Sequence, residues 1–131
     1  MSTSRNPESI PAPAGRYVHQ IEVTNPSKIL FISGQIGTMA DGSVPADPVE
    51  QLDLAMTYVM ANLAAAGLGV ESLTKVTTYA VGALDPAGRK AVLDKHLGAH
   101  ISCSTLVFVA ALARPRVPRR GRRLGGRVAL G

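Results

Sequence analysis

Four consecutive apolar residues, Ile29–Ile32, run directly into the small residues Ser33 and Gly34. An uninterrupted apolar run of this length predicts a strand that is buried on both faces. A serine and a glycine at its end leave the backbone amide accessible, because neither side chain is large enough to block a ligand. We therefore expect residues 29–36 to form a buried strand whose end borders a binding site.

Three further stretches, residues 17–23, 73–81 and 105–111, also predict strands. The first alternates along its length, and the second is rich in β-branched residues. Turn chemistry at Asn25-Pro26 separates residues 17–23 from residues 29–36. These two strands therefore predict a hairpin.

Two helices are expected from the same Asp-Pro signature, at Asp47-Pro48 and Asp85-Pro86. The aspartate can cap the helix, and the proline suits the first helical position. Apolar residues then recur at three- and four-residue steps up to Gly67, and the second helix covers residues 87–97. The order β-β-α-β-α-β predicts an α+β fold with two helices on one face of a mixed sheet.

A chain of 131 residues is long enough for one domain with a core of its own. Its single cysteine excludes an internal disulfide, and there is neither a secretion signal nor an apolar stretch of membrane-spanning length. We therefore expect a cytoplasmic protein without a membrane partner. No metal-ligand spacing or glycine-rich phosphate loop stands out, so we expect neither a metal nor a cofactor.

The positive charge is confined to residues 116–131, which contain six arginines and no acidic residue. Without these six charges the net charge falls from +5 to −1, so residues 1–115 are not basic. Aromatic residues make up only 4% of the chain, too few for the usual base-stacking platforms. We therefore expect no nucleic-acid partner.

Five short motifs, in this order over residues 8–114, resemble the Rid family of reactive intermediate deaminases, also called YjgF-type or L-PSP proteins: Pro13–Tyr17, Ser33–Gln35, Ala64–Gly67, Leu73–Tyr79 and Ser104–Val109. The resemblance implies the chorismate-mutase-like fold, assembled as a homotrimer. It also implies hydrolysis of a small imine or enamine in a cleft between subunits. The resemblance also allows ribonuclease activity or translation inhibition, although the near-neutral residues 1–115 and the few aromatic residues argue against it.

In the deaminating members, an arginine at the start of the fourth strand binds the substrate carboxylate and a glutamate on the last strand holds water. Here the arginine position falls on Cys103 and the glutamate position falls near Arg120. Cysteine cannot bind a carboxylate in the bidentate way that arginine does. No catalytic residue is assigned. The resemblance implies these substrate-binding candidates: Tyr17, Ser33, Gly34, Gln35, Cys103 and Ser104.

Residues 116–127 do not fit the last strand that the resemblance implies, because they show no sustained apolar alternation and Pro118 would break a central strand. We therefore divide the chain into a Rid-like domain, residues 1–115, and an atypical tail, residues 116–131. The tail is open to three interpretations: a bland basic tail, a nucleic-acid or membrane arm, or a frameshift near codon 115. Suitable codons for residues 116–123, shifted by one base, encode Glu-Tyr-Leu-Val-Glu-Val-Asp.

Three functions stay open. The first is a Rid-like hydrolase or deaminase, the second a non-catalytic trimer that binds a small molecule, and the third an L-PSP-type ribonuclease or translation inhibitor. A trimer also agrees with the sheet, since we expect its helix-free face to be apolar and to need a partner copy. The residues expected on that face are Leu30, Ile32, Val76, Val107 and Val109.

Overall fold

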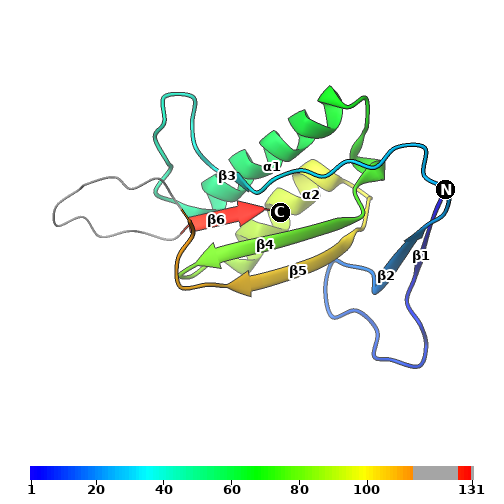
Figure 1. The fold of residues 1–131 in the computed structure, drawn as a ribbon. Coiled ribbons are helices and arrows are strands. Elements are labelled where there is room, and N and C mark those ends of the chain that lie inside the picture. Colours follow the sequence, from blue (N-terminus) through cyan, green and yellow to red (C-terminus); the bar gives the residue numbers. More distant parts are fainter. Residues whose placement is uncertain (114–126, 131) are drawn as a thin grey trace.

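The computed structural model describes residues 1–113 and 127–130 as a mixed sheet, two helices and a separate two-stranded ribbon (Figure 1). Within these residues neither helix is long and apolar enough to cross a membrane. The elements, in chain order, are β1 (Ser2–Arg5), β2 (Gln20–Val23), β3 (Gln35–Ile36), α1 (Pro48–Ala65), a short 3-10 turn (Val70–Ser72), β4 (Lys75–Val81), α2 (Pro86–Leu97), β5 (Cys103–Phe108) and β6 (Arg127–Leu130).

Both helices begin and end within two residues of the bounds that the sequence predicts. Asp47 and Asp85 each accept a hydrogen bond from a backbone amide in the first turn, and a proline follows each of them. Beyond the last turns, Gly67 and Gly98 adopt positive φ angles of 73° and 57°. A residue with a Cβ atom would be strained in this conformation, so glycine ends each helix without that cost.

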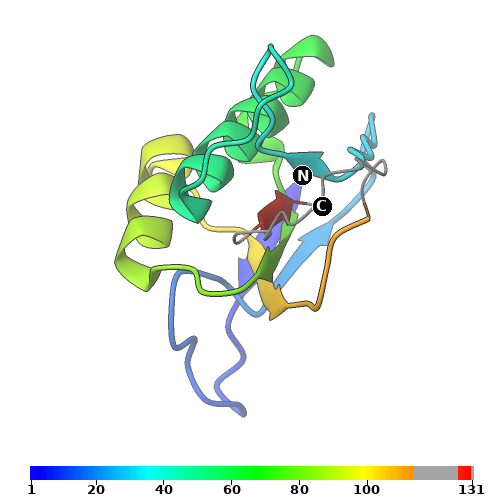
Figure 2. The same cartoon turned by 90° about the vertical axis from the view of Figure 1, so that its left-hand side faces the viewer.

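The four-stranded sheet has the order β3-β6-β4-β5, with β4 and β5 parallel and β6 antiparallel to both of its neighbours. Figure 2 shows both helices on the same side of this sheet. The α+β fold, with two helices on one face of a mixed sheet, is therefore confirmed.

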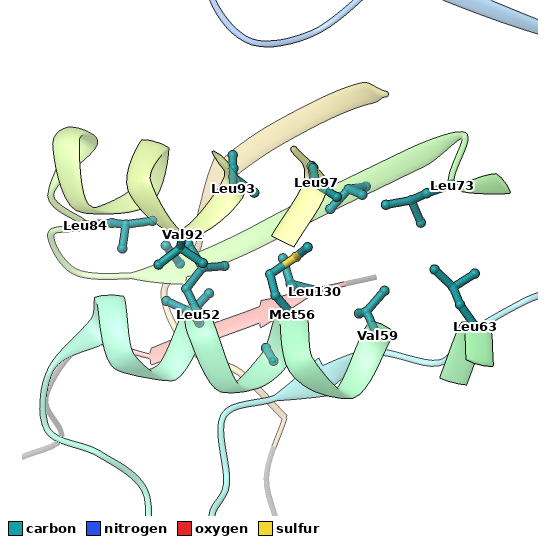
Figure 3. Packing of buried hydrophobic residues seen from close by; sticks show 14 residues of the cluster. Leu52, Met56, Val59, Leu63, Leu73, Leu84, Val92, Leu93, Leu97 and Leu130 are labelled. Atoms are coloured by element: carbon teal, nitrogen blue, oxygen red, sulfur yellow. The ribbon is translucent and has the colours of Figure 1, made fainter. Parts of the chain in front are cut away.

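The hydrophobic core lies between the helices and the sheet (Figure 3). Leu52, Met56, Val59 and Leu63 line one side of α1, at the three- and four-residue steps of an amphipathic helix. They face α2 and the sheet. Alternate residues of β4 belong to the same buried layer: Val76, Thr78 and Ala80.

The predicted hairpin between residues 17–23 and 29–36 is wrong. β2 pairs with β1, with Ser2 opposite Val23, and only Gln35 and Ile36 of the second segment form a strand. The apolar run is not a buried strand, because Phe31 is 90% exposed. An apolar run without a period indicates that a segment tends to pack against other apolar groups. It does not specify which strand the segment pairs with, or whether it pairs at all.

The interpretation of the whole of residues 116–131 as a tail outside the fold is also wrong. Residues 127–130 form β6 in the interior of the sheet, and Val128 and Leu130 are each 1% exposed. Their apolar alternation is only four residues long, which is too short to stand out next to the arginines. The frameshift hypothesis concerns residues 116–123, which lie outside the described residues, and it stays a hypothesis.

The residues expected on the helix-free face are partly wrong as well. Val76 is buried on the helix side, and Ile32 packs against the core. The helix-free face of β4 instead carries Lys75, Thr77 and Tyr79, because these alternate with the buried residues of the strand. This face is therefore mixed, with polar and aromatic side chains.

Candidate functional site

Arg16 fixes the N-terminal loop to the end of α2. Its Nε donates to Asp94 Oδ1 at 3.0 Å, its Nη1 donates to the carbonyl of His100 at 2.9 Å, and its Nη2 donates to the carbonyl of Gly98. The side chain is only 14% exposed. A cation at this position also interacts favourably with the negative end of the helix dipole. The next residue, Tyr17, is therefore held close to the end of α2.

Tyr17 lies beside the start of β5. The amide of Val18 donates to the carbonyl of Ser102 at 3.2 Å, which aligns this part of the loop with the residue before Cys103. The half-buried Tyr17 ring meets the His19 ring edge-on at 5.7 Å, and its hydroxyl accepts a hydrogen bond from the amide of Ala14. Of the candidate residues, the structure thus brings the segment of Tyr17 next to Cys103.

Cys103 and Ser104 are consecutive in β5, so their side chains point to opposite faces of the sheet. Ser104 is in register with the buried Val76 and faces the helices. Cys103 is in register with Lys75 and faces the helix-free side. The two candidates therefore do not border one common surface.

Lys75 is a functional candidate that we did not select from the sequence. It lies directly across the strand pair from Cys103, and its Nζ donates to Thr105 Oγ1 on the same face. An ammonium group next to Cys103 provides the positive charge that the cysteine lacks. The alternation of β4 could have indicated this residue, because it places Lys75 on the face opposite the buried Val76.

Ser33, Gly34 and Gln35 lie at the opposite edge of the sheet from Cys103. The order β3-β6-β4-β5 places three strand spacings, roughly 14 Å, between β3 and β5. Ser33 and Gly34 are exposed, and Gln35 donates through its Nε2 to the carbonyl of Ser33 at 3.0 Å. A single chain therefore does not bring these three residues together with Tyr17 and Cys103.

A groove of about 830 Å³ lies between the extended segment 29–33 and the first half of β4. It is open there because β6 pairs with β4 only from Thr78 to Val81. Its volume is that of a small-molecule pocket. Of the six residues selected from the sequence only Ser33 lines it. Lys75 lines it as well, so the groove meets the face of Cys103 at Lys75, although neither Tyr17 nor Cys103 borders it.

Among residues 1–113 and 127–130, no group of three histidine, cysteine, aspartate or glutamate side chains could hold a metal ion. The side chains near Cys103, those of Lys75, Thr105 and Cys103 itself, offer ammonium, hydroxyl and thiol groups. This agrees with binding and hydrogen bonding to a small polar ligand.

Comparison with known sequences gives two matches. The family model described as Endoribonuclease L-PSP matches residues 7–118. The RutC family protein YjgH of Escherichia coli (strain K12) is 35% identical over 72 residues, which are 51% of this chain and 55% of YjgH. The match thus spans about half the length of that curated relative.

Several solved structures share the fold. The conserved Rid family protein YyfB from Yersinia pestis, itself described as of unknown function, superposes with a TM-score of 0.75 at 22% identity, over 98% of this chain and 96% of YyfB. The YjgF gene product from E. coli has a TM-score of 0.59 at 26% identity, over 98% and 95% of the two chains. E. coli TdcF with bound serine has a TM-score of 0.58 at 27% identity, over 92% and 90%.

Proposed function

Because this chain belongs to the Endoribonuclease L-PSP family, also called the Rid family, we propose that it hydrolyses a small imine or enamine in a cleft between copies of the chain. The main observation in support is the position of Tyr17 beside the start of β5, next to Cys103. Arg16 and the hydrogen bond from Val18 to Ser102 hold it there. Lys75 adds a positive charge on the face of Cys103.

Imine hydrolysis needs a group that assists proton transfer at nitrogen and a group that orients the substrate. Water adds to the carbon of the C=N bond, a proton moves to nitrogen, and cleavage of the C–N bond leaves ammonia and a carbonyl compound. An enamine first takes up a proton on carbon and becomes the imine. The Tyr17 hydroxyl already accepts from Ala14, so its own proton is free to be donated to a ligand nitrogen.

Lys75 is the group we propose for orientation. Its ammonium can pair with a substrate carboxylate in place of the arginine that Cys103 replaces, although it lacks the bidentate geometry of arginine. The serine bound to TdcF is a small molecule with both a carboxylate and an amino nitrogen. We propose a ligand of this class here. β6 contains no acidic residue that could hold the attacking water, which predicts slow turnover.

We propose a homotrimer, because a cleft that contains both sets of candidate residues requires a second copy. Ser33 and Gly34 lie at the β3 edge, whereas Cys103 lies in β5 at the opposite edge. Exposed Phe31, Ile36 and Tyr79 provide apolar surface for an interface. Sedimentation of the full chain at micromolar concentration tests the assembly, and a monomer there would exclude the inter-subunit cleft.

Ammonia release from 2-aminoacrylate tests the activity. Tyr17→Phe is expected to lower kcat by about tenfold or more, because it removes the hydroxyl that donates the proton to nitrogen and leaves the ring in place. Lys75→Met is expected to raise KM for the carboxylate substrate. Lys95→Met, at an exposed position of α2, is the matched control and should leave both constants unchanged, because Lys95 pairs with Asp53 and not with the Asp94 that holds Arg16. No ammonia release above the uncatalysed rate would exclude the proposed hydrolase.

A non-catalytic small-molecule-binding trimer is the second candidate. It is favoured by the uncharged Cys103 and by the lack of an acidic residue in β6. Binding of a substrate analogue without ammonia release would identify it. Ribonuclease activity is the third candidate, and a salt-dependent RNA-binding assay with the full chain distinguishes it from the other two.

A further inference from the structure

Arg89 on α2 is a partly buried cation without a carboxylate partner. Its Nε is fully buried and has no hydrogen-bond partner among the described residues. Burial lowers the pKa of the guanidinium from its ordinary value. A buried charge is normally paired, because removing it from water is costly. The buried part of the Arg89 guanidinium therefore lacks the polar partner that such a group normally has.

No aspartate or glutamate of this chain pairs with the Arg89 guanidinium. Every aspartate and glutamate lies within residues 1–113, since residues 114–126 contain none. The ion pairs of the described residues join Arg5, Arg16, Lys90, Lys95 and His96 to acidic groups, and Arg89 is not among these cations. Within the described residues, no carboxylate supplies the counter-charge of Arg89, so an anionic ligand from outside the chain can provide it.

Ser104 shows where that charge can bind. Nη2 of Arg89 lies 3.5 Å from the Ser104 hydroxyl, at the long limit of a hydrogen bond. Nη1 has no hydrogen-bond partner among the described residues and is not a buried atom, so it keeps contact with solvent. Two guanidinium nitrogens and one hydroxyl thus converge at the edge of the sheet, on the helix side of β5. A carboxylate can accept from both nitrogens at once.

We propose that Arg89 and Ser104 form a binding site for the carboxylate of a small organic acid. The site is distinct from the surface of Tyr17 and Cys103, because Ser104 faces the helices and Cys103 faces away from them. The buried Nε makes the site recessed, so that only the end of the guanidinium is open to a ligand. Binding here is independent of imine hydrolysis.

The test is a titration of the full chain with pyruvate, followed through the side-chain Nε–H signal of Arg89 in a ¹⁵N-correlated NMR spectrum. Pyruvamide, which has the same size without the charge, is the ligand control. We expect a saturable shift of the Arg89 signal with pyruvate and none with pyruvamide. Equal shifts with the two compounds, or no shift with pyruvate, would overturn the proposal.

Variants separate this site from the Tyr17 surface. Arg89→Met is expected to weaken pyruvate binding, measured by calorimetry, at least about tenfold, Arg89→Lys less and Ser104→Ala about threefold. Arg5→Met, which removes an exposed arginine, should change nothing. Loss of pyruvate binding in Lys75→Met but not in Arg89→Met would assign the carboxylate to the Tyr17 surface and overturn the proposal.

Thermal unfolding without ligand separates a binding role from a structural one. Arg89→Met removes an unpaired buried charge, so its melting temperature should equal or exceed that of the parent. Arg89→Lys keeps the charge and should fold as the parent does. A sharp fall in melting temperature for both variants, or dissociation of an oligomer in Arg89→Met, would show that Arg89 serves the fold or a neighbouring copy instead.

Discussion

Gln51 on α1 accepts a hydrogen bond from the backbone amide of Val128 in β6 through its Oε1 at 3.2 Å. Its Nε2 donates to the carbonyl of Pro45 at 2.8 Å, in the loop before the helix. Gln51 is only 1% exposed, so both bonds are shielded from water. One buried amide therefore joins α1 and the preceding loop to an interior strand from the far end of the chain.

Gln51→Leu is expected to destabilise the protein by about 1–3 kcal/mol, because it leaves the buried amide of Val128 without this acceptor. Urea unfolding followed by circular dichroism measures the effect. Gln20→Leu, at an exposed position on β2, is the control and should cost less than about 0.5 kcal/mol. Equal stability of the two variants would mean that the bond to β6 does not stabilise the fold.

Leu130→Ala tests the position of β6 in the sheet. The side chain is 1% exposed, so its truncation should cost about 2–5 kcal/mol. Leu106→Ala, in the edge strand β5 and 37% exposed, should cost clearly less. Denaturant midpoints of the two variants are compared at equal slope. A neutral Leu130→Ala would place residues 127–130 outside the core.

Arg16→Met is expected to lower stability by about 1–3 kcal/mol and to reduce ammonia release, because Tyr17 loses its fixed position. In a double-mutant cycle with Tyr17→Phe, the two losses of activity should not add. Arg5→Met is the control, since Arg5 forms an exposed ion pair. Fully additive losses would show that Arg16 acts on something other than Tyr17.

Asp53 links α1 and α2 in a way that depends on pH. The hydrogen bond from His96 at 2.6 Å, together with Lys95, lowers the pKa of the Asp53 carboxyl from its ordinary value of 3.8, while burial acts in the opposite direction. A lowered pKa stabilises the fold above pH 3.8, and that contribution disappears as the pH falls through the folded-state pKa.

Asp53→Asn should therefore cost up to about 1 kcal/mol at pH 6, a value reduced for solvent screening of this partly exposed group. The difference from the parent should shrink as the pH falls below 3.8. Urea unfolding at several pH values measures this. Glu8→Gln, at an exposed position, should show no such dependence. A cost for Asp53→Asn that stays constant down to the lowest pH would contradict the linkage.

Cys103→Arg is expected to raise kcat/KM for carboxylate substrates, because a guanidinium on this face can bind a carboxylate with two hydrogen bonds. Lys75 across the strand pair adds to the positive charge there. Ser104→Arg is the matched control, because it places the same group on the opposite face of β5 and should not raise activity. An equal effect of both variants would argue against the Cys103 face as the substrate surface.

The helices and their limits could be predicted from the sequence, since each depends on residues close together in the chain. Asp47 and Asp85 cap amides within three positions, and Gly67 and Gly98 end the helices by local conformation alone. The Rid resemblance likewise depends on short motifs. For that reason the α+β fold and the family followed from the sequence alone.

Strand partners and the candidate site depended on contacts between distant parts of the chain. Residues 29–32 do not pair with residues 17–23 as predicted, because β2 pairs with β1 instead. Val128 and Leu130 are core residues only because β6 pairs with β4 in the interior of the sheet. Lys75 became a candidate because it is in register with Cys103. Arg89 became one because its side chain reaches the Ser104 hydroxyl. Pairing energy between segments so far apart is realised only in the folded chain, so tertiary structure alone decided which charges lie at each surface.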